Sequence, residues 1–194
     1  VRGESKTKYR FYSVLNKYIE RHHVHNDVFD TSQVNDFYAV LDGQQRLTSL
    51  YLGLCGSYAY HTYRKSWTNS EDSFPTRHLY LNITKIADKE TEENKYKFQF
   101  KDKKETNEAD LYEENECKWF RVGSIIKLHS SDNYDLDDFA DDNKLTKEEK
   151  KVIKRLEKVI FTDLLINFYE EDTEDPDKAV NIFVRINSGG TRLE

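Results

Sequence analysis

The sequence predicts an α+β fold in which a small mixed sheet packs against amphipathic helices. Two runs of alternating apolar and polar residues, 78–83 and 96–100, predict half-buried strands. An apolar stripe with three- and four-residue spacing follows Thr146 and predicts an amphipathic helix. A third observation combines a strand with a helix. The strand-like run 37–41 leads through a turn into a helical pattern that ends near Gly56.

The composition favours a globular protein and excludes several other classes. The chain has 194 residues, 34% of them charged, and a net charge of −6, a polarity at which disorder is the first concern. However, 13 Tyr, 11 Phe and 2 Trp beside only 7 Gly and 2 Pro predict a packed core. No apolar run approaches the roughly 20 residues that span a bilayer. Cys55 and Cys117 cannot form a disulfide framework, so we expect a cytoplasmic protein with reduced thiols and no membrane partner.

We interpret residues 1–194 as a single-domain fragment that is truncated at both ends, because the chain begins at Val1 and contains no Met. Within it, the stretch from about 84 to 116 is a charged insert. In the first part of the chain, apolar spacing from Tyr9 to His22 predicts an amphipathic helix. His22, His23 and His25 lack a helical four-residue step, so we favour a solvated helix end over a metal site.

The middle of the chain contains an aromatic segment and an acidic segment. Residues 57–77 hold aromatic side chains among polar ones and form either a platform for a nucleic-acid base or the packing of an irregular segment, which we favour. Residues 118–122 predict a strand that leads into a turn. The aspartates from Asp132 to Asp142 lack the order of a calcium loop, which favours a solvated acidic loop.

The last part of the chain has clear helix boundaries. Thr146 and Glu149 form a capping box before the apolar stripe, and residues 164–169 predict a strand. Pro176 predicts the first turn of another helix, which we expect to end at Gly189 and Gly190. The final four residues, 191–194, form a further capping box and predict the start of another helix.

The segment Asp42-Gly43-Gln44-Gln45-Arg46-Leu47-Thr48 lies at the predicted strand–turn–helix junction. Asp42 and Gln45 have capping-box spacing and Gly43 supplies the turn, so helix capping accounts for these three residues. Capping does not account for Arg46, because the first turn of a helix carries partial positive charge and disfavours a cation.

An anion bound at the helix start explains Arg46. Exposed N–H groups, a glycine that permits close approach and an arginine fork together form a phosphate cradle. In this interpretation the amides of Gln44 and Gln45 contact a base, a ribose or a phosphate, and Thr48 offers a hydroxyl. Asp42 orients Arg46 or binds a water of Mg²⁺. The physical argument alone leaves phosphate binding and capping equally open.

A second motif, Phe183-Val184-Arg185-Ile186-Asn187-Ser188-Gly189-Gly190-Thr191, lies near the end of the chain. A helix end followed by a new cap accounts for its glycines and Thr191 without a ligand. Alternatively, its backbone amides complete the same anion site, with Arg185 and Asn187 nearby. Taken alone, this motif favours the first interpretation.

Together, LDGQQRLTSL and the downstream IFVRINSGGTRLE resemble the N-terminal domain of GmrSD-type (type IV, modification-dependent) restriction endonucleases. The resemblance spans residues 37–194 and implies a fold similar to those of ParB and sulfiredoxin. Members usually open with an Ile-Pro-x-Tyr-Gln-Arg-like segment, which we do not find here, in keeping with truncation. Full-length members often carry a C-terminal His-Asn-His-type nuclease domain, for which this chain supplies no metal site.

The resemblance implies nucleoside-triphosphate binding and hydrolysis coupled to the cleavage of foreign or modified DNA in phage defence. It implies catalytic roles for Asp42, Gln45 and Arg46, with a nucleoside triphosphate and Mg²⁺ as cofactors. The implied nucleotide- or phosphate-binding residues are Gly43, Gln44, Thr48, Arg185, Asn187, Ser188, Gly189, Gly190 and Thr191. The implied partners are DNA and a C-terminal nuclease domain or partner chain.

Two other function classes remain open. One is a non-catalytic module that senses a nucleotide or DNA with the same fold. The other is a structural domain in which both motifs are helix caps only.

Overall fold

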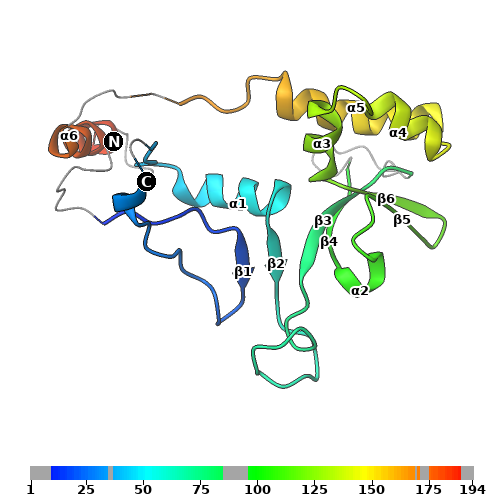
Figure 1. Ribbon diagram of the computed structural model, residues 1–194, viewed down its shortest axis with the longest axis horizontal. Coiled ribbons are helices and arrows are strands. Elements are labelled where there is room, and N and C mark those ends of the chain that lie inside the picture. The colour runs from blue at the N-terminus through cyan, green and yellow to red at the C-terminus, as the bar shows by residue number, and fades with distance from the viewer. Residues whose placement is uncertain (1–9, 35–36, 85–95, 169, 171–174, 189–194) are drawn as a thin grey trace. The chain divides into compact units, whose positions relative to one another are not determined.

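The computed structural model describes residues 10–34, 37–84, 96–168, 170 and 175–188, and these form an α+β fold, as the sequence predicts (Figure 1). The chain divides into two compact units. Unit 1 combines residues 1–15, 25–50 and 167–194, and unit 2 combines residues 16–24 and 51–166. Among the described residues, no helix has the length and apolar character needed to cross a membrane.

Unit 2 contains a mixed six-stranded sheet centred on one strand. Its strands are β1 (Lys17–Ile19), β2 (Ser57–Ala59), β3 (Arg77–Asn82), β4 (Phe98–Asp102), β5 (Leu111–Glu114) and β6 (Cys117–Arg121). The β1–β2 pair is parallel and the other pairs are antiparallel. The order is β1-β2-β3-β6-β5, and β4 also pairs with β3.

The register shows how three strands share β3. Arg77 pairs with residues in both β2 and β4, and Tyr80 pairs with residues in both β4 and β6. Because a strand has two edges, β2 and β6 must lie on the edge of β3 opposite β4. β2 pairs with this edge at Arg77, and β6 pairs with it from Tyr80 to Asn82.

Helices cover one face of this sheet and form the main core with it. They are α3 (Ser124–Ser130), α4 (Leu136–Asp142) and α5 (Lys147–Phe161), while the short α2 (Lys103–Thr106) follows β4. The core cluster consists of Leu81, Ile83, Phe120, Val122, Ile125, Leu128, Leu136, Phe139, Val152 and Ile153. Because strand side chains alternate, Leu81 and Ile83 share a face. Burying each such side chain contributes about 1.5–3 kcal/mol.

The start of α5 is joined to the sheet by a buried carboxylate. Thr146 and Glu149 form the capping box that the sequence predicts, with the Thr146 N–H donating to Glu149 Oε2 at 2.8 Å. Glu149 is only 5% exposed, and it also accepts from Lys118 Nζ at 3.2 Å and from the Thr84 hydroxyl at 3.3 Å. Helix capping and sheet packing therefore depend on the same side chain.

Unit 1 is held by aromatic contacts and by short backbone pairings. The ring of Phe37 meets those of Phe11 and Phe29 edge-on, with centroids 4.9 and 5.2 Å away. Tyr12 and Val28 form an isolated antiparallel bridge. The unit also contains the 3-10 helix η1 (Thr31–Gln33), α6 (Pro176–Ser188) and residues 44–50 of α1 (Gln44–Leu54).

Several predicted elements are confirmed with shifted ends. The strands predicted at 78–83, 96–100 and 118–122 are β3, β4 and β6, and the helices predicted after Thr146 and at Pro176 are α5 and α6. The charged insert 84–116 contains β4, α2 and β5, while its residues 85–95 lie outside the described residues. The helix predicted at 191–194 also falls outside them.

Other predictions are wrong. Described residues 10–22 contain β1 instead of a helix, since Tyr18 stacks on Tyr58 of β2 with centroids 4.8 Å apart. The segment 37–41 and the described residues 164–168 form no strand, because no neighbouring strand pairs with them in the described structure. The turn expected after the strand is present at Val122 and Gly123, but it leads directly into α3, which was not predicted.

The acidic segment 132–142 contains a helix where a loop was predicted. Asp135 caps α4 by accepting from the N–H groups of Asp137 and Asp138, and the Asp138 side chain completes a capping box. Leu136, Phe139 and Ala140 are buried by this helix. The acidic residues thus stabilise the helix start, where negative charge is favourable.

We predict that Glu149→Gln lowers the free energy of unfolding by about 1.5 kcal/mol at pH 7, because a buried charge-assisted contact is lost. Burial raises the pKa of Glu149, but the Thr146 N–H and Lys118 more than offset this, so the pKa lies below the usual 4.5. The carboxylate therefore stabilises the fold above the unfolded pKa, and this contribution disappears as pH falls through the folded pKa. Urea unfolding at pH 7 and at pH 3–4 should show the difference from wild type shrinking in acid.

Glu148→Gln is the matched control, since Glu148 is exposed in the same helical turn. Its unfolding free energy should stay close to wild type at both pH values. An equal loss of stability in the two variants would contradict a specific role for Glu149.

Candidate functional site

A left-handed glycine forms the turn before α1. Gly43 has φ +72°, a conformation that residues with a Cβ rarely adopt. Its carbonyl accepts the first helical hydrogen bond, from the Leu47 N–H at 2.9 Å. The N–H groups of Gln44, Gln45 and Arg46 therefore precede the intrahelical ladder of α1. This geometry provides the helix start that the sequence predicts at the Asp-Gly-Gln-Gln-Arg segment.

Asp42 does not cap the helix in the way that its spacing with Gln45 suggested. Asp42 Oδ1 accepts from the N–H of Gly43, the next residue, at 2.6 Å. Asp42 Oδ2 lies 3.9 Å from Arg46 Nη2, and the two side chains are 62% and 80% exposed. Such an exposed pair contributes little to stability. The Asp42 carboxylate therefore closes the turn and faces Arg46.

The remaining residues of the first motif lie along the first turns of α1. The Gln44 side-chain amide donates to the Val40 carbonyl at 2.8 Å. Gln44 and Gln45 are exposed, and Thr48, one turn on from Gln44, is half-buried. Gln44, Gln45 and Arg46 therefore present polar side chains around amides that make no intrahelical bond.

The second motif is described only in part. Arg185 lies in the last turn of α6, which continues through Asn187 and ends at Ser188. Gly189, Gly190 and Thr191 lie outside the described residues. α6 and residues 42–50 belong to unit 1, so the two motifs, far apart in sequence, fall in one compact unit.

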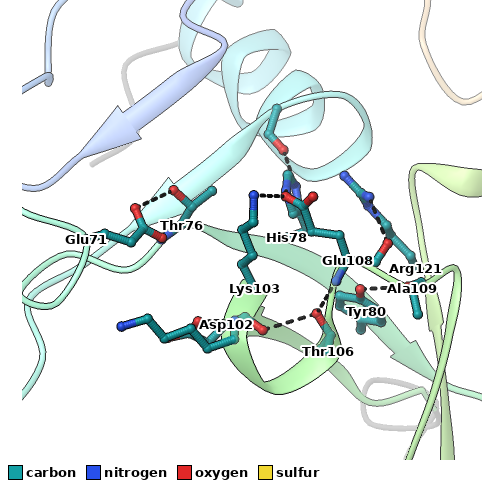
Figure 2. A network of polar contacts seen from close by, with 12 residues as sticks. Glu71, Thr76, His78, Tyr80, Asp102, Lys103, Thr106, Glu108, Ala109 and Arg121 are labelled. Carbon is teal, nitrogen blue, oxygen red and sulfur yellow. Dashed lines mark hydrogen bonds and ion pairs between the residues drawn. The ribbon is translucent and has the colours of Figure 1, made fainter.

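A polar network in unit 2 was not predicted (Figure 2). His78 Nδ1 lies 3.1 Å from the Gly56 carbonyl oxygen, and its Nε2 lies 3.8 Å from Glu108 Oε1. Glu108 also pairs with Lys103 Nζ at 3.2 Å, and Arg121 Nη1 donates to the Glu108 carbonyl at 3.4 Å. The network joins β3, β6 and the turn after α2.

Burial controls the ionisation of two members of this network. Burial, together with the positive charge of Arg121, lowers the pKa of His78, which favours a neutral imidazole at pH 7. Burial also raises the pKa of Tyr80, whose hydroxyl donates to the Ala109 carbonyl at 2.8 Å. The strand pattern places His78 and Tyr80 on β3, but the other members come from segments that the pairing of β3 with β4 and with β6 brings close.

Metal-ligating side chains do not cluster in the described part of the chain, where no group of three or more His, Cys, Asp or Glu residues is arranged to hold an ion. Of the histidines near residue 22, His22 packs edge-on against Phe74, with centroids 4.8 Å apart.

We predict that Gly43→Ala speeds hydrogen exchange of the α1 amides about fivefold, because a left-handed alanine costs about 1 kcal/mol. The new Cβ would also lie 3.2 Å from Arg46 Nη2, the flexible end of a side chain. Gly43→Asn adds the same Cβ but tolerates a positive φ, so it should exchange more slowly than Gly43→Ala. Equal exchange in the two variants would show that the left-handed conformation does not limit this helix start.

A family model described as GmrSD restriction endonuclease, N-terminal domain, matches residues 6–194. This match covers nearly all of the chain and both motifs, so the chain belongs to this family. No curated protein matches the chain. Family membership makes the chain part of a restriction endonuclease system and implies an interaction with DNA.

Proposed function

We propose that this member of the GmrSD N-terminal domain family binds a nucleoside triphosphate at the start of α1 and hydrolyses it during DNA restriction. The proposal rests on the position of Arg46, a cation with an 80% exposed side chain in the first turn of a helix. The partial positive charge of that turn disfavours a cation, and the long, exposed pair with Asp42 offsets this only weakly. A bound phosphate reverses the effect, because the helix amides and the guanidinium then attract the same anion.

In this proposal each residue of the turn has a separate role. Gly43 permits a phosphate to approach the N–H groups of Gln44 and Gln45 without a Cβ in the way. The Arg46 fork binds phosphate oxygens and stabilises the charge that develops as the terminal phosphate leaves. Asp42 faces Arg46 at 3.9 Å and orients it. Gln45 positions the attacking water, and Thr48 adds a hydroxyl one turn further on.

The chemistry of Asp42 fits a role in holding Mg²⁺. Its exposed carboxylate has one oxygen on the Gly43 N–H, while the other lies at a long distance from Arg46. Mg²⁺ is commonly held by one or two carboxylates, waters and phosphate oxygens. When bound, the ion neutralises charge on the phosphates. Asp42 would hold it through a coordinated water.

The second motif extends the proposed site. Arg185 and Asn187 lie in the last turn of α6, in the same compact unit as the first motif. The residues that follow, Ser188 to Thr191, supply small side chains and backbone amides of the type that surround phosphates. We propose that these residues complete the nucleotide site.

The exposure of the first motif favours a second candidate function. Asp42, Gln45 and Arg46 are all exposed in the described structure, whereas catalytic phosphate sites exclude bulk water. An open site of this kind suits a sensor that binds a nucleotide without turnover. DNA, a nuclease domain or a partner chain would then respond to whether the nucleotide is bound.

We predict that Arg46→Ala lowers kcat for nucleotide hydrolysis by about 100- to 1,000-fold, the usual effect of removing one preorganised charge donor. Arg46→Lys should retain part of the rate, since it keeps the charge but loses the fork. The measurement is phosphate release from ATP, GTP, CTP and UTP, with and without Mg²⁺. Arg155→Ala is the matched control, because Arg155 is another partly exposed helical arginine paired with an aspartate.

Calorimetric binding of the same nucleotides separates the candidate functions. Tight binding that depends on Arg46 without turnover would support the sensor. If Arg46→Ala changed neither binding nor turnover and altered only thermal stability, the turn would be a helix cap and the proposal would fail.

A further inference from the structure

A long loop joins β2 to β3 in unit 2 (Figure 1). Several of its aromatic side chains are exposed. Tyr63 is 81% exposed, Trp67 47% and Tyr60 42%. Exposed aromatic side chains that gather in one place mark candidate recognition surfaces, whereas single ones are ordinary. Their common location between residues 60 and 67 makes this loop a distinct surface.

The loop is held by internal hydrogen bonds. The Thr62 N–H donates to the Ser73 carbonyl at 2.8 Å, which closes the loop across its width. At its base, the buried Arg77 donates from Nη1 to the Tyr60 carbonyl at 2.9 Å. The His61 N–H donates to Glu20 Oε2 at 2.9 Å. These hydrogen bonds therefore fix the loop backbone from which the exposed aromatic rings extend.

Trp67 and Tyr63 differ in what their rings contact. The His61 ring stacks on Trp67 with centroids 3.8 Å apart and planes 4° apart. Arg21 Cζ lies 4.1 Å from the Trp67 centroid, so two groups this close must occupy opposite faces of the indole. Packing is thus confirmed for Trp67. Tyr63 keeps most of its ring exposed, with Arg64 Cζ 5.1 Å from its centroid.

Two arginines lie near these rings, although the whole chain carries −6, and the nearby Glu20 carboxylate accepts from the His61 N–H. Arg21 and Arg64 are exposed beside the two aromatic rings. The loop carboxylates are engaged elsewhere, since Glu71 accepts from the N–H and hydroxyl of Thr76 and Asp72 pairs with Lys104 at 2.6 Å. Arg21 and Arg64 both have positive φ, which is uncommon for arginine.

We propose that this loop binds unpaired nucleotides of a nucleic acid, with a base stacked on Tyr63 and backbone phosphates paired with Arg64 and Arg21. An exposed aromatic ring beside guanidinium groups is the combination that sequence-tolerant binders of single strands use. A protein partner would also contact the Tyr63 ring, but a nucleic acid, as a polyanion, would in addition pair with the two arginines. This site lies in unit 2, away in sequence from the Asp42–Arg46 turn, and its evidence does not depend on nucleotide hydrolysis.

Fluorescence anisotropy with a labelled single-stranded 16-mer DNA, its duplex, and a duplex with a central mismatched bubble tests the proposal. The wild-type chain should bind the single strand and the bubble more tightly than the duplex. Tyr63→Ala should raise the Kd for the single strand roughly tenfold, whereas Tyr63→Phe, which keeps the ring, should stay within about twofold. Arg64→Asn should raise it about fivefold and lower the salt slope by about 0.7.

Lys144→Asn is the matched control for Arg64→Asn. Lys144 is also exposed, basic and in a left-handed conformation, so both variants lose one positive charge and place Asn, which tolerates a positive φ, at such a position. Its Kd should equal that of wild type. The proposal is overturned if wild type binds none of the three DNAs, if Tyr63→Ala binds as tightly as wild type, or if Lys144→Asn weakens binding as much as Arg64→Asn. Nucleotide hydrolysis by Tyr63→Ala without DNA should equal wild type, which separates failure at this loop from failure at the Asp42–Arg46 turn.

Discussion

The backbone hydrogen bonds of β3 are the constraint on which the arrangement of unit 2 depends. β2, β4 and β6 pair with this strand directly, while β1 and β5 join through one neighbour. The core residues Leu81 and Ile83 then meet α3 and α5 on one face.

The side chain of Lys101, on β4, is 3% exposed and lies 2.7 Å from Glu114 of β5 and 4.3 Å from the Trp119 ring. A buried ammonium persists there because it is paired and lies over an aromatic ring.

The elements that the sequence predicted correctly are those whose signals are local. The Thr146–Glu149 capping box and the stripe after it need no distant partner to specify α5. β1 depends on a partner far along the chain, since Lys17 pairs with Ser57, so the local pattern misidentifies it. In β1 the aromatic and β-branched residues also fit helical spacing, and pairing with β2 decides the outcome. β5 is hidden in a charged stretch and forms because Leu111–Glu114 pairs with β6.

The same difference between local signals and contacts with other segments applies to the candidate site. Gly43 and the helix start at Gln44 were predictable, because a glycine before an amphipathic pattern is a local signal. The pairing of the Asp42 carboxylate with the Gly43 N–H was not, since spacing alone cannot choose between nearby backbone donors. The His78–Glu108–Lys103 network was also hidden, because its members meet only through the β3–β4 register and the turn after α2. Packing was the correct expectation for Trp67, whereas the exposure of Tyr63 depends on how the loop is tied.

The division of one β3 edge between β2 and β6 also has a consequence for folding fidelity. A strand that slides by one residue along its neighbour turns every core side chain to the opposite face, and an uninterrupted edge offers nothing to stop it. Here β2 occupies the position at Arg77 and β6 the positions from Tyr80 to Asn82, so each strand blocks the other from sliding along the shared edge. Two short strands placed end to end thus fix each other's register along β3. The correct pairing of either strand favours the correct pairing of the other.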